Sequence, residues 1–408
     1  MTAGGHQPVR WIRRHFHGIG YVLIVLLVGA NMPSPLYGLY RAEFGFSPVV
    51  QTLVFAVYAA ALVPALLVFG PLSDAIGRRP VLATALLFGA AGAVLMACAD
   101  STGWLFAGRI AQGLSVGTCS AAGAAALAEH EPDGDHRRAG VAATATTAAG
   151  AALGPVFAGV VAEYLPDGFV LPYLLYLVTL VPAAVALALL PGSRRRAPGA
   201  VRERASVQLP RVPRRIRTAF AVAVAASATA WAVVGLFQAV VPSWITDLLG
   251  VDNLVVGAAA AALVMVCSAV VQLSVRGLAP VVSQRIGLTL LLVGMGGLLL
   301  VGRMESLVLL FVTTAVVGFG HGLAFSGGMQ QVTAAVTAEA PESRGAVLAT
   351  FYTIVYAGLG LPAVAAGLLV TYQGMAQAMN EFALAAAVAC ALILAWHPRV
   401  SRRPEQAA

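Results

Sequence analysis

Three polar side chains stand inside long apolar stretches, where they could form hydrogen bonds, carry a charge or, in the case of the histidine, exchange a proton. Arg109 and Gln112 share the stretch 104–127, and His321 lies within 306–329. A charge at the centre of a bilayer costs about 2.5–3.5 kcal/mol on insertion scales, so such a group usually faces a partner or a watery cavity. Histidine, with an ordinary pKa of about 6.5, exchanges protons near neutral pH. Two alternatives stay open: Arg109 could snorkel toward the surface near Trp104, and His321 could be a hydrogen-bonded packing residue.

A second polar group, the segment Gly70–Leu82 (GPLSDAIGRRPVL), lies between two apolar stretches. Gly70 and Gly77 suit a tight turn, because glycine adopts backbone angles that other residues avoid. Asp74 can accept hydrogen bonds or face the positive end of a helix. Arg78 and Arg79 add two cations. The pattern predicts a structured loop at the membrane surface, and an ordinary loop acid is the alternative for Asp74.

A third group is a row of small residues in the stretch 139–162. Gly150 and Gly154 are four residues apart, and Pro155 and Gly159 follow. Small residues at this spacing let helix backbones approach closely, and proline frees a carbonyl and bends the helix. The row predicts either a moving interface or ordinary helix packing.

Composition indicates the elements that hold these groups. Of the 408 residues, 59% are hydrophobic and 10% are charged, and the mean hydropathy is +0.85. In an ordinary soluble domain about a quarter of the residues are charged, so this composition excludes such a domain. A spanning helix takes about 20 apolar residues, which predicts an all-α membrane protein of about twelve spans. The predicted spans are 19–38, 50–70, 81–99, 104–127, 139–162, 169–190, 218–246, 254–275, 283–302, 306–329, 346–371 and 379–396.

The distribution of arginine predicts the orientation. All 25 basic residues are arginine. With both termini in the cytoplasm, every arginine except Arg41, Arg109 and Arg303 falls on the cytoplasmic side, as the positive-inside rule requires. The formal charge of +8 therefore reports topology, and no nucleic-acid partner is expected. Arg13 and Arg14 before a short apolar run also suit a signal peptide, but cleavage would remove a predicted span.

The chain divides into two similar halves. Residues 1–191 and 218–408 each hold half of the predicted spans, and the arginine-rich stretch 192–217, with several prolines, is typical of a cytoplasmic linker. Such a parallel repeat places a path between the halves near the bilayer midplane. A shift of 207 positions superposes Asn31 on Gln238, Pro35 on Pro242, Gly70 on Gly277, Arg78 on Arg285 and Pro155 on Pro362.

These motifs resemble those of one family. The pattern Gly-x-Leu-x-Asp-x-x-Gly-Arg-Arg from Gly70 is similar to the loop signature after the second helix of major facilitator superfamily transporters. Arg109-x-x-Gln112-Gly113 resembles a fourth-helix motif of that superfamily. Gly150-x-x-x-Gly154-Pro155-x-x-x-Gly159 resembles its antiporter signature, with a departure at Ala158. The resemblance covers nearly the whole chain and is strongest to the 12-helix drug:proton antiporter group.

The resemblance implies roles for several residues. Arg109 and Gln112 would take part in proton coupling, and we add His321 as the deep titratable group. Asp74 would contact the start of the eleventh helix, near residues 343–346, and latch the cytoplasmic side shut in the outward-facing state. Arg78 would tie the 70–82 segment to acids such as Glu129.

The resemblance also places a substrate cavity between the halves. The first, seventh and tenth helices usually line it in this superfamily, which assigns Asn31, Gln238 and His321 to its wall. Aromatic side chains could hold an apolar or aromatic solute there, and ordinary contacts between helices are the alternative. The aromatic candidates are Tyr37, Phe237, Tyr352 and Tyr356. Many proton-coupled relatives carry a deep carboxylate, which this chain lacks, so a cationic substrate is disfavoured.

These features predict a secondary transporter, not an enzyme. It would export a small neutral or anionic organic compound in exchange for protons, as a monomer spanning the plasma (inner) membrane many times. The four cysteines lie on different spans without metal-ligand spacing, so no metal or cofactor is expected. Two alternatives stay open: a proton-coupled uptake symporter for a sugar or metabolite, and a membrane sensor or scaffold that transports nothing, which would predict an added domain.

Overall fold

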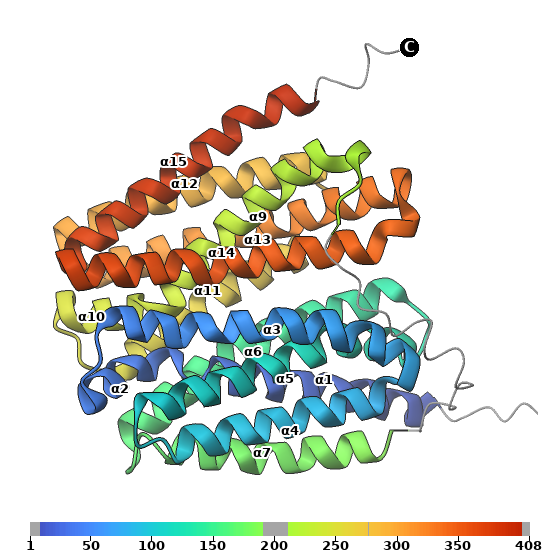
Figure 1. The fold of residues 1–408 in the computed structure, drawn as a ribbon, viewed down its shortest axis with the longest axis horizontal. Helices are drawn as coiled ribbons and strands as arrows, with labels where there is room; N and C mark the ends of the chain where they lie inside the picture. The colour runs from blue at the N-terminus through green and yellow to red at the C-terminus, as the bar shows by residue number, and fades with distance from the viewer. Residues whose placement is uncertain (1–8, 191–210, 276, 402–408) are drawn as a thin grey trace, which may run out of the picture.

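The computed structural model describes residues 9–190, 211–275 and 277–401 and is all helical in these ranges. Helices of the first half lie together in the lower part of Figure 1, and those of the second half lie in the upper part. The first half comprises α1 (Val9–Asn31), the 3-10 turn η1 (Ser34–Leu36), α2 (Tyr37–Phe44), α3 (Pro48–Ile76), α4 (Arg78–Ala97), α5 (Thr102–Glu129), α6 (His136–Tyr164) and α7 (Leu171–Ala188). The second comprises η2 (Arg214–Ile216), α9 (Arg217–Ala239), α10 (Val241–Leu249), α11 (Leu254–Ser274), α12 (Pro280–Met304), α13 (Leu307–Glu339), η3 (Pro341–Ser343), α14 (Arg344–Gln373) and α15 (Met375–Ser401).

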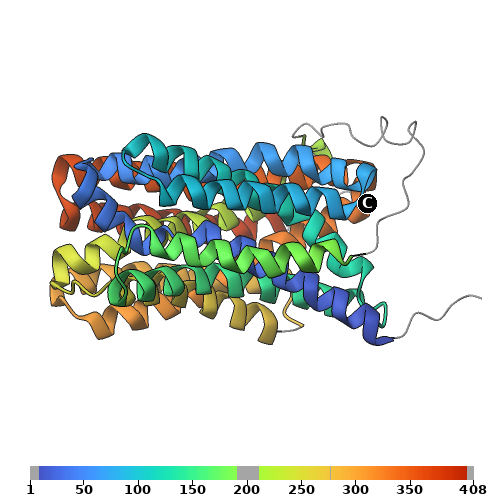
Figure 2. The ribbon, with the colours of Figure 1, turned by 90° about the horizontal axis from the view of Figure 1, so that it is seen from below.

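Twelve helical segments among the described residues are long and apolar enough to cross a membrane, which confirms the predicted fold class. The start of α1 and the end of α15 lie at the same end of the bundle, on the right of Figures 1 and 2. We call this the terminal end and the opposite one the distal end. Most of the predicted linker, residues 191–210, lies outside the described residues, and the described part leads through η2 into α9.

The first and seventh spans are each broken at the distal end. α1 ends at Asn31, and the chain continues through η1 into α2. The predicted span 218–246 is likewise not one helix, because α9 ends at Ala239 and α10 begins at Val241. Prolines directly after each break lack the N–H that would continue the hydrogen-bond ladder.

The predicted repeat is visible at these breaks and fails at one loop. Asn31 ends α1, and Gln238, related to it by the 207-residue shift, is the last residue but one of α9. Gly70 is helical within α3, whereas Gly277 lies between α11 and α12 with a φ of 81°. α11 ends at Ser274 and is shorter than α3, so the two connections after these helices are built differently.

Two pairs of helices bring the halves together. α3 packs against α14, and α6 packs against α11. Glycine permits part of this approach: a Cβ at Gly159 of α6 would meet Ala258 Cβ of α11 at 2.7 Å. The halves thus contact along two seams, and the space between the seams is available for a central cavity.

Candidate functional site

A cavity of about 490 Å³ lies between the two halves. Four helices of each half line it: α1, α3, α5 and α6 from the first, and α9, α11, α13 and α14 from the second. Such a volume is typical of small-molecule sites. The cavity therefore draws equally on both repeats, as the parallel arrangement of the sequence predicts.

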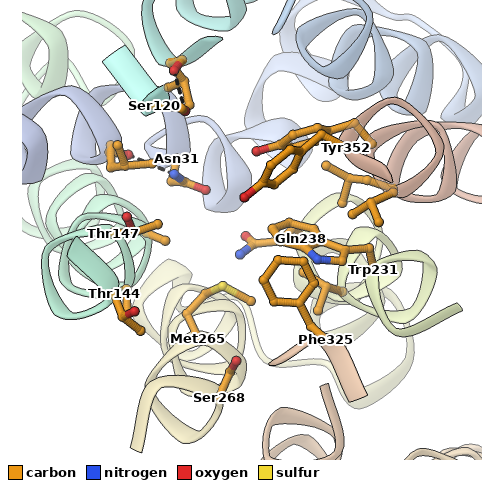
Figure 3. Close-up of a pocket in the computed structure, with 18 of the residues that line it drawn as sticks. Asn31, Ser120, Thr144, Thr147, Trp231, Gln238, Met265, Ser268, Phe325 and Tyr352 are labelled. Atoms are coloured by element: carbon orange, nitrogen blue, oxygen red, sulfur yellow. Dashed lines mark hydrogen bonds between the residues drawn. The ribbon is translucent and has the colours of Figure 1, made fainter. Parts of the chain in front are cut away.

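The two walls of the cavity differ in chemistry (Figure 3). The second half contributes a cluster of aromatic rings: Trp231 lies 5.7 Å from both Phe325 and Tyr356, and Tyr352 stacks on Tyr356 at 6.4 Å, measured between ring centroids. We call these four residues the aromatic wall. The first half contributes small hydroxyl side chains at the facing side, labelled Ser120, Thr144 and Thr147 in Figure 3.

Arg109 lies on the wall of this cavity and is buried within the bundle, with 2% of its surface exposed. Its Nη1 donates to the main-chain oxygen of Ala30 and to Gln112 Oε1, both at 2.7 Å. The guanidinium carbon lies 4.4 Å from the ring centre of Tyr58, within cation–π range. This burial excludes the snorkelling alternative in this structure. Gln112 lies behind Arg109 and does not itself line the cavity.

His321 also lines the cavity and is 3% exposed. Its Nδ1 lies 2.9 Å from Ser268 Oγ, which accepts a hydrogen bond from Gln272 Nε2 at 2.9 Å. The Ser268 hydroxyl can donate its own hydrogen to Nδ1, and in that tautomer the proton of the neutral ring is on Nε2. Nε2 has no partner among the described residues. The ring packs edge-on against Trp231 at 5.1 Å.

The two amides predicted for the cavity both line it. Asn31 Nδ2 donates to Leu27 O at 2.8 Å, and Gln238 Oε1 is buried without a partner among the described residues. Tyr352 and Tyr356 line the cavity as well.

Tyr37 and Phe237 do not line the cavity, contrary to the prediction. Tyr37 follows the break after α1 and is 1% exposed in the closed distal end. Phe237 directly precedes Gln238 on α9, and adjacent helical side chains point about 100° apart. Since Gln238 faces the cavity, Phe237 is turned into the helix packing, where it is fully buried.

Hydrogen bonds between the halves close the distal end of the cavity. Ser34 Oγ donates to Gln238 O at 2.5 Å. Gln51 Nε2 donates to Ala239 O at 2.7 Å and to Ser243 Oγ at 3.2 Å. We call the five residues of these contacts the distal gate: Ser34, Gln51, Gln238, Ala239 and Ser243.

Two further contacts join the halves at the distal surface. Arg41 pairs with Asp247 at 3.1 Å, and Glu163 accepts from the Leu254 N–H at 2.9 Å. The cavity lining, by contrast, extends along α6 and α11 toward the terminal end, to Ala143 and Gln272. The structure is therefore closed at the distal end.

The 70–82 segment is more helical than predicted. α3 continues through Gly70 and Asp74 to Ile76, and only Gly77, with a φ of 99°, interrupts the chain before α4. The helix continues because its main-chain groups remain paired at this membrane end, while Gly77 alone supplies the left-handed angle of the turn. The prediction of a loop from Gly70 is thus wrong, and that of a turn at Gly77 is confirmed.

Three polar contacts fix this turn. Arg78 Nη1 lies 2.5 Å from Asp74 Oδ1, and Arg78 Nη2 lies 2.9 Å from Glu129 Oε1, which confirms the predicted tie to α5. Arg79 donates to Leu190 O at 3.1 Å, at the end of α7. Asp74 itself stays half exposed. Its predicted contact with the start of α14 belongs to the opposite, outward-facing state and remains a prediction.

The glycines of α6 serve two neighbours. A Cβ at Gly154 would lie 2.6 Å from Val28 O of α1, and one at Gly150 would lie 2.7 Å from Ile24 O. Gly159 instead faces α11 of the other half. Pro155 lies within the helix. The row therefore holds α6 against α1 and also forms part of a seam between the halves.

Several lining residues were missed from the sequence. Trp231 lies seven residues before Gln238, and Phe325 lies four after His321, so helical spacing places each on the same face as a predicted cavity residue. Ser268 gave no such signal, since its role depends on contact between α11 and α13.

The sequence matches one family profile over most of its length and individual known proteins over shorter stretches. The sequence profile of the Major Facilitator Superfamily matches residues 19–361. The inner membrane transport proteins YnfM and YajR of Escherichia coli K12 are 35% identical over 96 residues and 32% identical over 149 residues. The multidrug resistance protein MdtL of E. coli O45:K1 is 33% identical over 98 residues. These alignments cover 24%, 35% and 24% of this chain and only 23%, 32% and 25% of the respective relatives.

The fold matches solved structures over almost its full length. A bacterial homologue of the human lysosomal transporter Spinster superposes with a TM-score of 0.69 in its inward-facing and occupied form and 0.71 in its inward-facing and unoccupied form. Each comparison covers 98% of both chains, at 14% and 12% identity. The family profile shows that the chain belongs to the Major Facilitator Superfamily, and the twelve spans among the described residues and the matching fold agree with that membership.

Proposed function

We propose that this transporter exports a small organic compound, neutral or anionic, in exchange for protons by alternating access. The observation that carries the proposal is the central cavity, which is closed at the distal end and lined by aromatic rings, Arg109 and His321. With both termini in the cytoplasm, as the arginine distribution favours, the structure represents the inward-facing state. A solute would then be taken up from the cytoplasmic side and released after the halves rock about the site.

Export is favoured over uptake by the small-residue row of α6, which resembles the antiporter signature. The partial similarity to a multidrug resistance protein points the same way. In the proposed cycle, the solute leaves while the cavity faces outward, and a proton bound there accompanies the return. His321 is the histidine in the described cavity wall and is our candidate for that proton.

Proton-coupled uptake is the second candidate, and one observation favours it. Arg109 and His321 line the same cavity. Protonation of His321 would add a second positive charge there, so a proton and an anion would strengthen each other's binding. That linkage suits co-transport, whereas exchange requires proton and solute to replace each other.

The deciding experiment uses the full chain in proteoliposomes with an acidic interior and a pH-sensitive dye. Matched panels of neutral, anionic and cationic aromatic compounds are added outside. Exchange predicts that transported compounds raise the internal pH, and that the effect is lost in Asp74→Asn and in empty liposomes. Labelled solute that moves without proton release, or that moves outward together with protons when loaded inside, would replace exchange by another coupling.

A further inference from the structure

The structure points to a substrate class for the cavity: we propose that it binds an aromatic organic anion, with the negative group at Arg109 and the ring against the aromatic wall. This inference rests on the proposed function only in taking the cavity as the transport site. It holds for either direction of proton coupling.

The first argument is the charge of Arg109. Its partners among the described residues are neutral: Ala30 O, Gln112 Oε1, the hydroxyl of Tyr37 and the ring of Tyr58. No aspartate or glutamate occurs among the described residues that line the cavity. A buried guanidinium with only neutral partners retains an unbalanced positive charge, and an anionic ligand would balance it where water is excluded.

The second argument is an excess of hydrogen-bond donors. Arg109 Nε, Trp231 Nε1 and His321 Nε2 are buried and lack partners among the described residues. Arg109 Nε and Trp231 Nε1 always carry a hydrogen, and His321 Nε2 carries one when Ser268 donates to Nδ1 or when the ring is protonated, whereas Gln238 Oε1 is the corresponding unpartnered acceptor on the lining. Unpaired buried donors are costly, so a ligand rich in acceptor atoms gains most from this cavity.

The third argument is the shape of the second-half wall. Trp231, Phe325, Tyr352 and Tyr356 form one continuous set of ring contacts. A flat aromatic body packs well on such faces and edges. The charged and aromatic features belong to opposite halves, so one ligand carrying both would contact both halves at once and respond to their relative motion.

A cation would meet no counter-charge here. Two acidic residues at the distal end are already engaged: Glu163 accepts from the Leu254 N–H, and Asp247 pairs with Arg41. Bringing a second positive charge beside Arg109 in a low-dielectric cavity is unfavourable. The cavity therefore discriminates by charge as well as by shape.

The test is equilibrium binding to the purified full chain in detergent, by calorimetry, with matched probes. The probes are 2-naphthoate, its methyl ester and 2-naphthylmethylammonium, which share the ring system and differ in charge. We expect the carboxylate to bind at least about tenfold more tightly than the ester, as one charge-assisted contact would give, and the ammonium to bind most weakly. Equal affinity for carboxylate and ester, tighter binding of the ammonium, or no binding by the carboxylate would overturn the proposal.

Variants locate the anion. Arg109→Gln should reduce the preference for carboxylate over ester to about one, and Arg109→Lys should keep part of it because the charge remains. Arg285→Gln removes an exposed arginine near the start of α12 and should leave the preference unchanged. An undiminished preference in folded Arg109→Gln would contradict the assignment, and the wild-type comparison stands even where that variant fails to fold. Binding is measured without a proton gradient, so charge-selective binding without exchange would refute only the proposed coupling.

Discussion

Ser34 donates a 2.5 Å hydrogen bond to the main-chain oxygen of Gln238, joining the broken ends of the first and seventh spans. The side chain of Gln238 lines the cavity, so one residue belongs both to the distal gate and to the candidate binding site. A solute that contacts this side chain therefore contacts the same residue whose main-chain oxygen joins the halves. This geometry offers a direct route from binding to opening.

The distal gate should weaken when Gln51 is replaced. Gln51→Leu removes two hydrogen bonds between the halves, to Ala239 O and Ser243, and keeps the side-chain volume. We expect a shift of about 1–2 kcal/mol, roughly tenfold in population, toward a state open at the distal end. Distances between spin labels at the distal ends of α2 and α10 measure this shift.

Gln377→Leu is the matched control, because the Gln377 amide contacts Glu381 within the same helix. It should leave the distance distribution as in the wild type. An unchanged distribution in Gln51→Leu would show that the hydrogen bonds of Gln51 do not hold the gate closed.

Asp74 should matter for transport more than for stability. In this structure its carboxylate pairs with Arg78 while remaining half exposed, and such surface pairs contribute about 0–1 kcal/mol. Asp74→Asn should therefore lower the melting temperature little. It should slow transport about tenfold or more if it loses the latch of the opposite state.

Glu129→Gln is the comparison for this prediction, because it removes the other carboxylate that contacts Arg78. Melting curves and initial transport rates of both variants are measured together. Equal loss of transport in the two variants would show that Asp74 acts by positioning Arg78. It would contradict the predicted latch between Asp74 and the start of α14.

Adding a side chain at Gly154 should destabilise the folded protein. The Cβ of Gly154→Ala would lie 2.6 Å from Val28 O and 3.0 Å from Asn31 Cβ. Overpacking of this kind typically costs about 1–3 kcal/mol, which thermal unfolding in detergent would detect. Gly140→Ala, on the same helix, meets nothing within 4 Å and should be neutral or slightly stabilising. Similar melting temperatures for both variants would show that α1 and α6 can separate without cost.

His321 should be needed for coupling. His321→Gln keeps a hydrogen-bonding side chain beside Ser268 but removes the imidazole, which is the candidate proton carrier. We expect solute exchange across the membrane to persist while solute-driven proton movement is lost. His136→Gln, at the exposed start of α6, should behave as wild type. Full proton coupling in His321→Gln would exclude His321 as the carrier.

The sequence by itself determined the spans and their likeness in the two halves. Apolar length decides whether a segment can cross a bilayer, and this is a local property, so all twelve predicted spans have a helical counterpart. The turn at Gly77 was also predicted correctly from its glycine, and the tie from Arg78 to Glu129 was predicted correctly from the family resemblance.

Only the tertiary structure decided which polar groups meet. The pairing of His321 with Ser268, the burial of Arg109 against Ala30, and the exclusion of Phe237 from the cavity depend on how each helix is rotated against its neighbours. In a chain that is apolar on most sides, hydrophobic periodicity does not fix that rotation. It is set instead by close packing at small residues and by the need of each buried polar group for a partner.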